Sequence, residues 1–294
     1  MRIVASRVRR QLGALVALAA VTGAAGCTGP GGAGQSADPQ RQGEATYQAA
    51  PSAHVHAVAI SQWDGLTYAA THDGLFRFGD GEPQRLGPVI DLMGFTIAAP
   101  DRFLASGHPG PGADLPEPLG LVESRDGGQS WTPLSRGGES DFHALTAARA
   151  DVLGFDGREL LRSGDGQTWH TLPVPAAPHA LTASPYSTTV LATSESGLLR
   201  SPDAGTTWQP VPGAPLLQVA TFADVTTAFG ITPDGVVARS DDAGQTWTTV
   251  AELGQAPHAV GARRTANGKV RLVVATAQGL TVSDDGGATF HDGL

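Results

Sequence analysis

The stretch Ser201-Pro-Asp203-Ala-Gly205-Thr-Thr207-Trp208 carries the pattern S-x-D-x-G-x-T-W, and this pattern decides the fold of the chain. Its aspartate can accept the backbone N–H groups of a tight turn, and its glycine supplies a conformation that other residues resist. The aromatic ring then packs beneath the turn. Similar segments, called the boxes below, occur five times, at residues 124–131, 163–169, 201–208, 240–247 and 283–290, with the aspartates Asp126, Asp165, Asp203, Asp242 and Asp285.

The spacing of the boxes predicts a repeat architecture. The aromatic residues that end successive boxes are 38, 39, 39 and 43 residues apart. Repeats of this length are typical of four-stranded propeller blades, which bury their faces against one another. Residues 54–78 have the other features of the repeat without a box and make a sixth copy. We therefore expect an all-β, six-bladed β-propeller over residues 51–294, with seven blades less favoured and a strand at 44–50 pairing into the last blade.

The first 26 residues have the features of an export signal. Four arginines lie among the first ten residues, and the apolar stretch that follows at 12–21 is too short to span a bilayer. Small residues then lead to Cys27, the only cysteine. This resembles a bacterial lipoprotein signal, which implies lipid on Cys27 and a place on the outer face of the cell membrane. An ordinary cleaved signal is the alternative.

The region between this signal and the repeats is expected to be a tether. Residues 27–50 are rich in Gly, Pro, Gln, Ser and Ala, as flexible linkers are. The predicted organisation is therefore a signal peptide at 1–26, a flexible tether at 27–50 and the propeller at 51–294.

The charge of the chain excludes one class of partner. It carries 19 basic and 28 acidic residues, a net charge of −9, and four of the basic residues belong to the first 26. Nucleic-acid binding needs clustered basic charge, so no nucleic-acid partner is expected. With a single cysteine, an intrachain disulfide is excluded as well.

At its boxes the chain resembles the Asp-box, or BNR, propellers, a group that includes sialidases, sortilin-type receptors, xyloglucanase-like enzymes and a photosystem assembly factor. The segments 68–76, 91–95 and 105–112 are similar to those of bacterial exported proteins labelled exo-α-sialidase or glycosyl hydrolase. The resemblance covers residues 54–294. It implies a propeller in which the boxes are structural turns on the face opposite the usual ligand site.

The sequence does not contain the set of residues that sialidases use for catalysis. Sialidases clamp the substrate carboxylate with three arginines and use a tyrosine nucleophile with Glu and Asp partners. Here Arg41, in the tether, is the only arginine between the signal and the first repeat, and the setting Arg-Ile-Pro is missing. Tyr47 lies in the tether, Tyr68 in a predicted strand and Tyr186 in a predicted turn. No catalytic residue is assigned.

Histidines gather on the face opposite the boxes, called the box-free face below. The starts of first strands and the loops between second and third strands share this face, and seven of the nine histidines fall there. Imidazole suits Zn and Cu, and a thioether such as Met93 favours Cu. We expect packing roles for His179 and His258. Aligned repeats place a ring at the mouth of the axial channel, made of His56, Met93, His143, His179, Gln218 and His258, and the candidate metal ligands are His56, His72, His108 and His143.

Two loops extend the candidate site on this face. Residues 107–119 form a long segment with four prolines, Asp114 and Glu117, and residues 136–143 carry Glu139 and Asp141. Such loops on a rigid scaffold often carry function, and a plain surface insertion is the alternative. The candidate ligand-binding residues are His54, His56, His72, Asp73, Met93, His108, Asp114, Glu117, Glu139, Asp141 and His143.

Three functions remain open from the sequence. The first is a cell-surface binding module for a small molecule, glycan or protein, with a His-rich metal site. The second is an exo-α-sialidase-like glycoside hydrolase that uses a carboxylate pair, which requires carboxyl groups about 5 Å or about 6.5–9.5 Å apart. The third is an assembly scaffold for membrane proteins. The carboxylates available for a pair are Asp73, Asp114, Glu117, Glu139 and Asp141.

Overall fold

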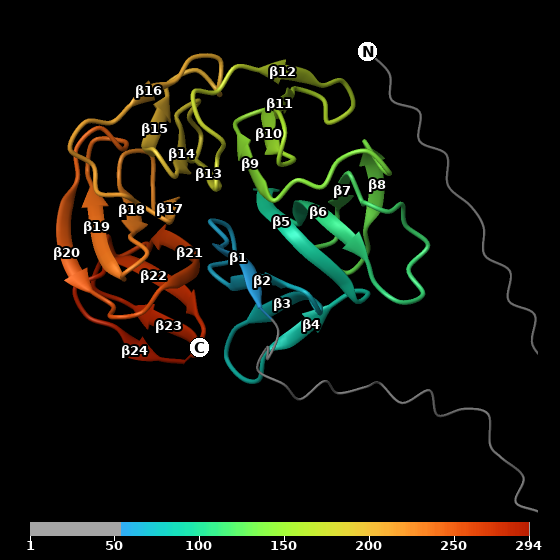
Figure 1. Ribbon diagram of the computed structural model, residues 1–294. Coiled ribbons are helices and arrows are strands. Elements are labelled where there is room, and N and C mark those ends of the chain that lie inside the picture. Colours follow the sequence, from blue (N-terminus) through green and yellow to red (C-terminus); the bar gives the residue numbers. More distant parts are fainter. Residues whose placement is uncertain (1–53, 294) are drawn as a thin grey trace, which may run out of the picture. The chain divides into compact units, whose positions relative to one another are not determined.

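The computed structural model describes residues 54–293, which fold into six four-stranded antiparallel sheets arranged as the blades of a propeller (Figure 1). The described part is all-β, and the prediction of a six-bladed β-propeller is confirmed. Within it, no helix has the length and apolar character needed to cross a membrane. The expected signal peptide, Cys27, the tether and the strand at 44–50 lie outside the described residues.

Each blade is built from four strands that follow one another in the sequence. Blades 1 to 3 are β1–β4 (Val55–Ile60, Thr67–Thr71, Gly74–Phe78, Gln84–Leu86), β5–β8 (Ile90–Ala99, Arg102–Pro109, Leu121–Ser124, Thr132–Ser135) and β9–β12 (Ala144–Ala148, Asp151–Phe155, Leu160–Ser163, His170–Leu172). Blades 4 to 6 are β13–β16 (Ala180–Ala183, Val190–Ser194, Gly197–Ser201, Gln209–Pro210), β17–β20 (Val219–Phe222, Ala228–Ile231, Val236–Ser240, Thr248–Glu252) and β21–β24 (Pro257–Arg264, Val270–Thr276, Gly279–Ser283, His291–Asp292).

The ring closes where blade 6 meets blade 1. The innermost strands β21 and β1 pack against each other there (Figure 1). Buried apolar side chains such as Val58 and Phe76 of blade 1 and Val273 and Val282 of blade 6 form one cluster across this seam. Among the described residues no strand is shared between blades, so this closure depends on side-chain packing.

The boxes are hydrogen-bonded turns, as their composition predicts. In the third box the Ser201 hydroxyl accepts the Gly205 N–H (2.8 Å), and Asp203 Oδ1 accepts the Thr207 N–H (2.8 Å). Trp208 packs against the apolar cluster between blades 3 and 4. In the shortened second box, the backbone N–H groups of Thr168 and Gln167 lower the pKa of Asp165 to about 2.

The strand order fixes which residues share a face. Because neighbouring strands are antiparallel, the start of each innermost strand lies at the same end of the blade as the loop between second and third strands. The boxes, between third and fourth strands, lie at the other end. The histidines of the first three repeats are thereby placed together on the box-free face.

Candidate functional site

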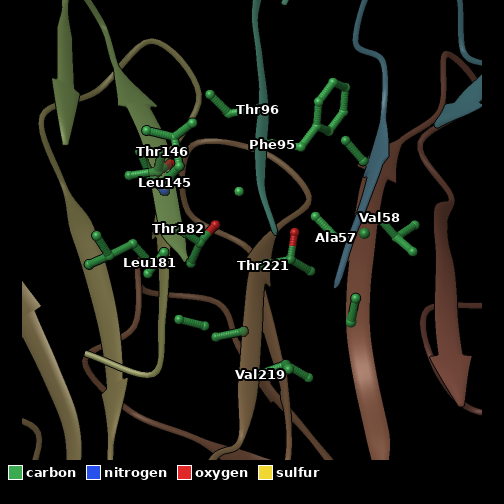
Figure 2. A pocket seen from close by; sticks show the side chains of 18 of the residues that line it. Ala57, Val58, Phe95, Thr96, Leu145, Thr146, Leu181, Thr182, Val219 and Thr221 are labelled. Carbon is green, nitrogen blue, oxygen red and sulfur yellow. Dashed lines mark hydrogen bonds between the residues drawn. The ribbon is translucent and has the colours of Figure 1, made fainter. Parts of the chain in front are cut away.

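The innermost strands enclose a cavity along the propeller axis. Its volume is about 820 Å³. Small and hydroxyl-bearing side chains surround it, including Ala57, Thr96, Thr182 and Thr221 (Figure 2). As the alignment of the repeats predicts, the lining also contains His56, Met93, His143, His179, Gln218 and His258.

Irregular strand pairing directs three of these side chains. The register of the innermost strand shifts between Val55 and Ala57, between Leu92 and Gly94, and between Pro257 and Ala259. A β-bulge changes the direction of the residue that it inserts and is common beside functional sites. The residues at these three bulges are His56, Met93 and His258.

His56 and His72 of blade 1 meet Asp91 of blade 2 on this face. His72 Nδ1 lies 2.9 Å from Asp91 Oδ1 and 3.4 Å from His56 Nε2, and His56 Nε2 lies 3.8 Å from Asp91 Oδ1. Atoms that bind one ion at about 2.0–2.2 Å lie about 2.8–3.6 Å from each other in octahedral or tetrahedral geometry. These three residues, called the triad below, therefore have nearly the spacing of metal ligands.

One oxygen of the triad carboxylate lies within ion-pair distance of His72 but has no hydrogen bond in the described part of the chain. Asp91 Oδ1 is buried and accepts no hydrogen bond from the described residues, although His72 Nδ1 is so close. A buried carboxylate oxygen that accepts no hydrogen bond is costly, and a bound cation would offset this cost. Close contact without a hydrogen bond is also the arrangement of two ligands of one ion.

Tight backbone packing holds Asp91 in place. Gly107 pairs with the neighbouring Leu92, and a Cβ atom added to Gly107 would lie 2.0 Å from the carbonyl oxygen of Asp91. The glycine is therefore needed for β5 and β6 to approach each other at the Met93 bulge.

The environment of His56 keeps its imidazole neutral at neutral pH. Burial, together with the neighbouring His72 and His54, lowers the pKa of His56 to about 4 against the opposite effect of Asp91. Metal ligands must be deprotonated, so a neutral imidazole at neutral pH is the required state. The triad thus offers two imidazoles and one carboxylate, a set that leaves coordination positions open for another ligand.

A second cluster of histidines and carboxylates lies between blades 2 and 3. His108 Nδ1 is 2.6 Å from Glu117 Oε1, and His108 Nε2 is 3.1 Å from Asp141 Oδ2. The same Asp141 oxygen is 2.6 Å from His143 Nε2. Hydrogen bonding to Glu117 raises the pKa of His108, and hydrogen bonding to Asp141 raises the pKa of His143. This cluster favours protonated imidazoles, so it is less suited to a metal than the triad.

The two groups belong to one region of the box-free face. Asp91 and His108 are paired across β5 and β6, and the charge of Asp91 raises the pKa of both His108 and His143. His143 in turn lowers the pKa of His56. The four candidate metal ligands from the sequence therefore divide into two pairs, with His56 and His72 on Asp91 and His108 and His143 on Asp141.

The remaining candidates lie apart from these contacts. Asp114 is exposed in its loop, and Glu139 is exposed and pairs with Arg136 at 3.7 Å. The backbone N–H of Asp73 donates to the Thr71 hydroxyl in the turn after β2. Met93 lines the cavity.

One residue of the triad, Asp91, was not among the sequence candidates. Asp91 stands at the position that His54 occupies in the first repeat, and this alignment was the signal that could have identified it. His258, a member of the predicted ring for which a packing role was expected, has its ring centroid 4.3 Å from that of His54. The group of neighbouring imidazoles on the box-free face therefore includes one from blade 6.

Comparisons with known proteins identify the fold of the chain and no family. No protein-family model matches the sequence, and no curated protein matches it. A xyloglucanase of family GH74 from Xanthomonas campestris is similar in structure, with a TM-score of 0.59 and 17% identity over 82% of this chain. This chain spans only 38% of the length of that enzyme.

Two further solved structures are of a size closer to this chain. A chain of a nidogen–laminin complex has a TM-score of 0.60 and 14% identity, covering 77% of this chain and 91% of its own length. Virginiamycin B lyase from Staphylococcus aureus has a TM-score of 0.52 and 14% identity, covering 82% and 84%. The chain is thus similar to propellers with different activities, and these similarities show its β-propeller fold.

Proposed function

We propose that this chain is an exported, lipid-anchored binding protein whose site is a transition-metal centre at the box-free mouth of the axial channel. The triad His56, His72 and Asp91 supplies the ligands. The observation that carries the proposal is that one donor atom from each of the three residues lies within 4.8 Å of the other two. The export signal and the lipid on Cys27 rest on the sequence pattern.

The donor set narrows the identity of the ion. Two imidazoles and one carboxylate suit Zn²⁺ and Cu²⁺, whereas Mg²⁺ and Ca²⁺ prefer oxygen ligands. Met93 lines the same cavity from the adjacent blade, and its thioether favours copper. Zinc and copper are therefore the candidate ions.

The ion would act as the attachment point for a ligand. Three protein ligands leave at least one position open, and one of them, His56, also lines the cavity of about 820 Å³. A ligand with a carboxylate, imidazole or amine could bind the ion while its body enters the channel. This is a binding role at the cell surface.

The hydrolase alternative needs a carboxylate pair, and two of its candidates are brought together around one histidine. Glu117 and Asp141, two of the five candidate carboxylates, each bind His108. Their charges are therefore engaged with an imidazole that lies between them.

The proposal is tested by metal titration of the full-length chain purified in detergent. Calorimetry with ZnCl2, CuCl2 and MgCl2 should show binding of zinc or copper and none of magnesium at the same concentrations. His72→Ala and Asp91→Asn should each weaken binding by more than about 10–100-fold, the effect of losing a partner of a metal ligand. His170→Ala, an exposed histidine on β12, is the control and should bind like wild type. Equal affinities in all four proteins would reject the triad.

A further inference from the structure

We infer that His54 and His258 hold a second ion, which ties the last blade of the propeller to the first. The inference rests on the proposed function, because it assumes that the site takes up imidazole-binding metals. The two ring centroids are 4.3 Å apart with an interplanar angle of 44°. Imidazole rings this close, and not stacked in parallel, can turn a nitrogen of each towards one ion.

The two histidines come from opposite ends of the described chain. His54 directly precedes β1, and His258 lies in β21 at the bulge between Pro257 and Ala259. Strands β1 and β21 are the innermost strands of blades 1 and 6, and they pack against each other. An ion bound by both side chains would therefore lie across the seam that closes the ring.

A metal ion that bridges two blades should stabilise the fold most at this seam. Within the described residues each blade consists of its own four strands, and only packing joins blade 6 to blade 1. A metal clip restricts the unfolded chain more when the loop that it closes is longer, and this one would close about 200 residues. The second ion would thus stabilise the propeller as a whole.

The second position is adjacent to the triad and separate from it. The ring centroid of His54 lies 4.9 Å from that of His56 and 6.1 Å from that of His72. His56 and His72 are engaged with Asp91, whereas His54 faces His258. With two imidazoles against three ligands in the triad, the second position should fill at higher metal concentration.

The number of ions per chain tests the inference. Equilibrium dialysis of the full-length chain against ZnCl2, followed by elemental analysis, should give two ions for wild type. His258→Gln, which keeps a polar side chain of similar size, should retain one ion, and so should His72→Ala. The control His170→Ala should retain two.

The possible results separate the two claims. One ion in both wild type and His258→Gln would overturn the second position and leave the triad intact. Two ions in His258→Gln would also overturn it. No ion in wild type would overturn the proposed function and this inference together.

Thermal unfolding tests whether the second ion stabilises the closed ring of blades. Zinc at about 100 times the Kd of the second position should raise the Tm of wild type by about 5–10 °C more than that of His258→Gln. The midpoints of both proteins without metal show that the variant folds. An equal zinc-induced rise in Tm in the two proteins would overturn this stabilising role, even if two ions are bound.

Discussion

His72 Nδ1 in blade 1 lies 2.9 Å from Asp91 Oδ1 in blade 2, yet the oxygen accepts no hydrogen bond from the described residues. The two residues come from a loop after a second strand and from the start of the next innermost strand. The propeller topology therefore brings donor atoms from neighbouring blades to one point on the box-free face. A cation placed there would pair the buried carboxylate and join the two blades.

The lowered pKa of His56 predicts a pH dependence of folding. Its pKa is about 4 in the folded protein, against about 6.5 in the unfolded chain. Between these values only the unfolded chain is protonated at this residue, so the stability that it contributes is present above pH 6.5 and lost as the pH falls towards 4. When the pH of the metal-free protein is lowered from 7.5 to 5, its free energy of unfolding, measured with urea, should fall. The fall should be smaller in His56→Gln than in wild type. The same loss in both proteins would contradict the assignment.

The boxes are predicted to be structural and separate from the site. Asp203→Ala removes the acceptor of the Thr207 N–H, and Trp208→Ala leaves a cavity between blades 3 and 4. Each should lower the free energy of unfolding by about 1–4 kcal/mol, with unchanged zinc affinity. Asp80→Ala, at an exposed position, is the control and should change it by less than about 0.5 kcal/mol. A box variant with wild-type stability and lost zinc binding would contradict this prediction.

An arginine joins blade 4 to the box of blade 5. The Arg200 guanidinium donates from Nε to the carbonyl oxygen of Ala243 at 2.8 Å. Arg200→Ala should cost about 1–3 kcal/mol of unfolding free energy, because a half-buried carbonyl loses a charged donor. Chemical denaturation measures this, with the exposed Arg158→Ala as control. Equal stability of the two variants would show that the contact contributes nothing.

Lipid attachment at Cys27 is tested by fractionation. Cys27→Ser in the producing cell should move the protein from the membrane fraction to the soluble fraction, because a lipid chain on this cysteine is the proposed anchor. Mass spectrometry of the wild-type N-terminus should show an acylated Cys27. Unchanged membrane retention of the variant would reject the anchor.

The number of blades and the position of the histidines within the repeat could be predicted from the sequence. The box spacing set the length of a blade, and the recurring His-Ala openings placed His56 and His143 at equivalent positions. Both positions line the same cavity in the structure. These features repeat along the chain, so each copy supports the reading of the others.

The partners of the histidines could not be predicted in the same way. Asp141 and Glu117 reach His108 through loops whose conformations no repeat determines, whereas Asp114 of one of these loops is exposed. Repeat patterns compare the blades one by one, whereas closure of the ring makes the last blade a neighbour of the first. The contact of His258 with His54 follows from that closure.

Anomalous diffraction from crystals grown with zinc, collected at the zinc absorption edge, tests the central claim most directly. A triad-bound ion should give a peak about 2.0–2.2 Å from His56 Nε2, His72 Nδ1 and Asp91 Oδ1. Crystals of Asp91→Asn should lose that peak. Zinc found only elsewhere, for example at His291 and Asp284, which lie 3.4 Å apart on the opposite face, would contradict the account.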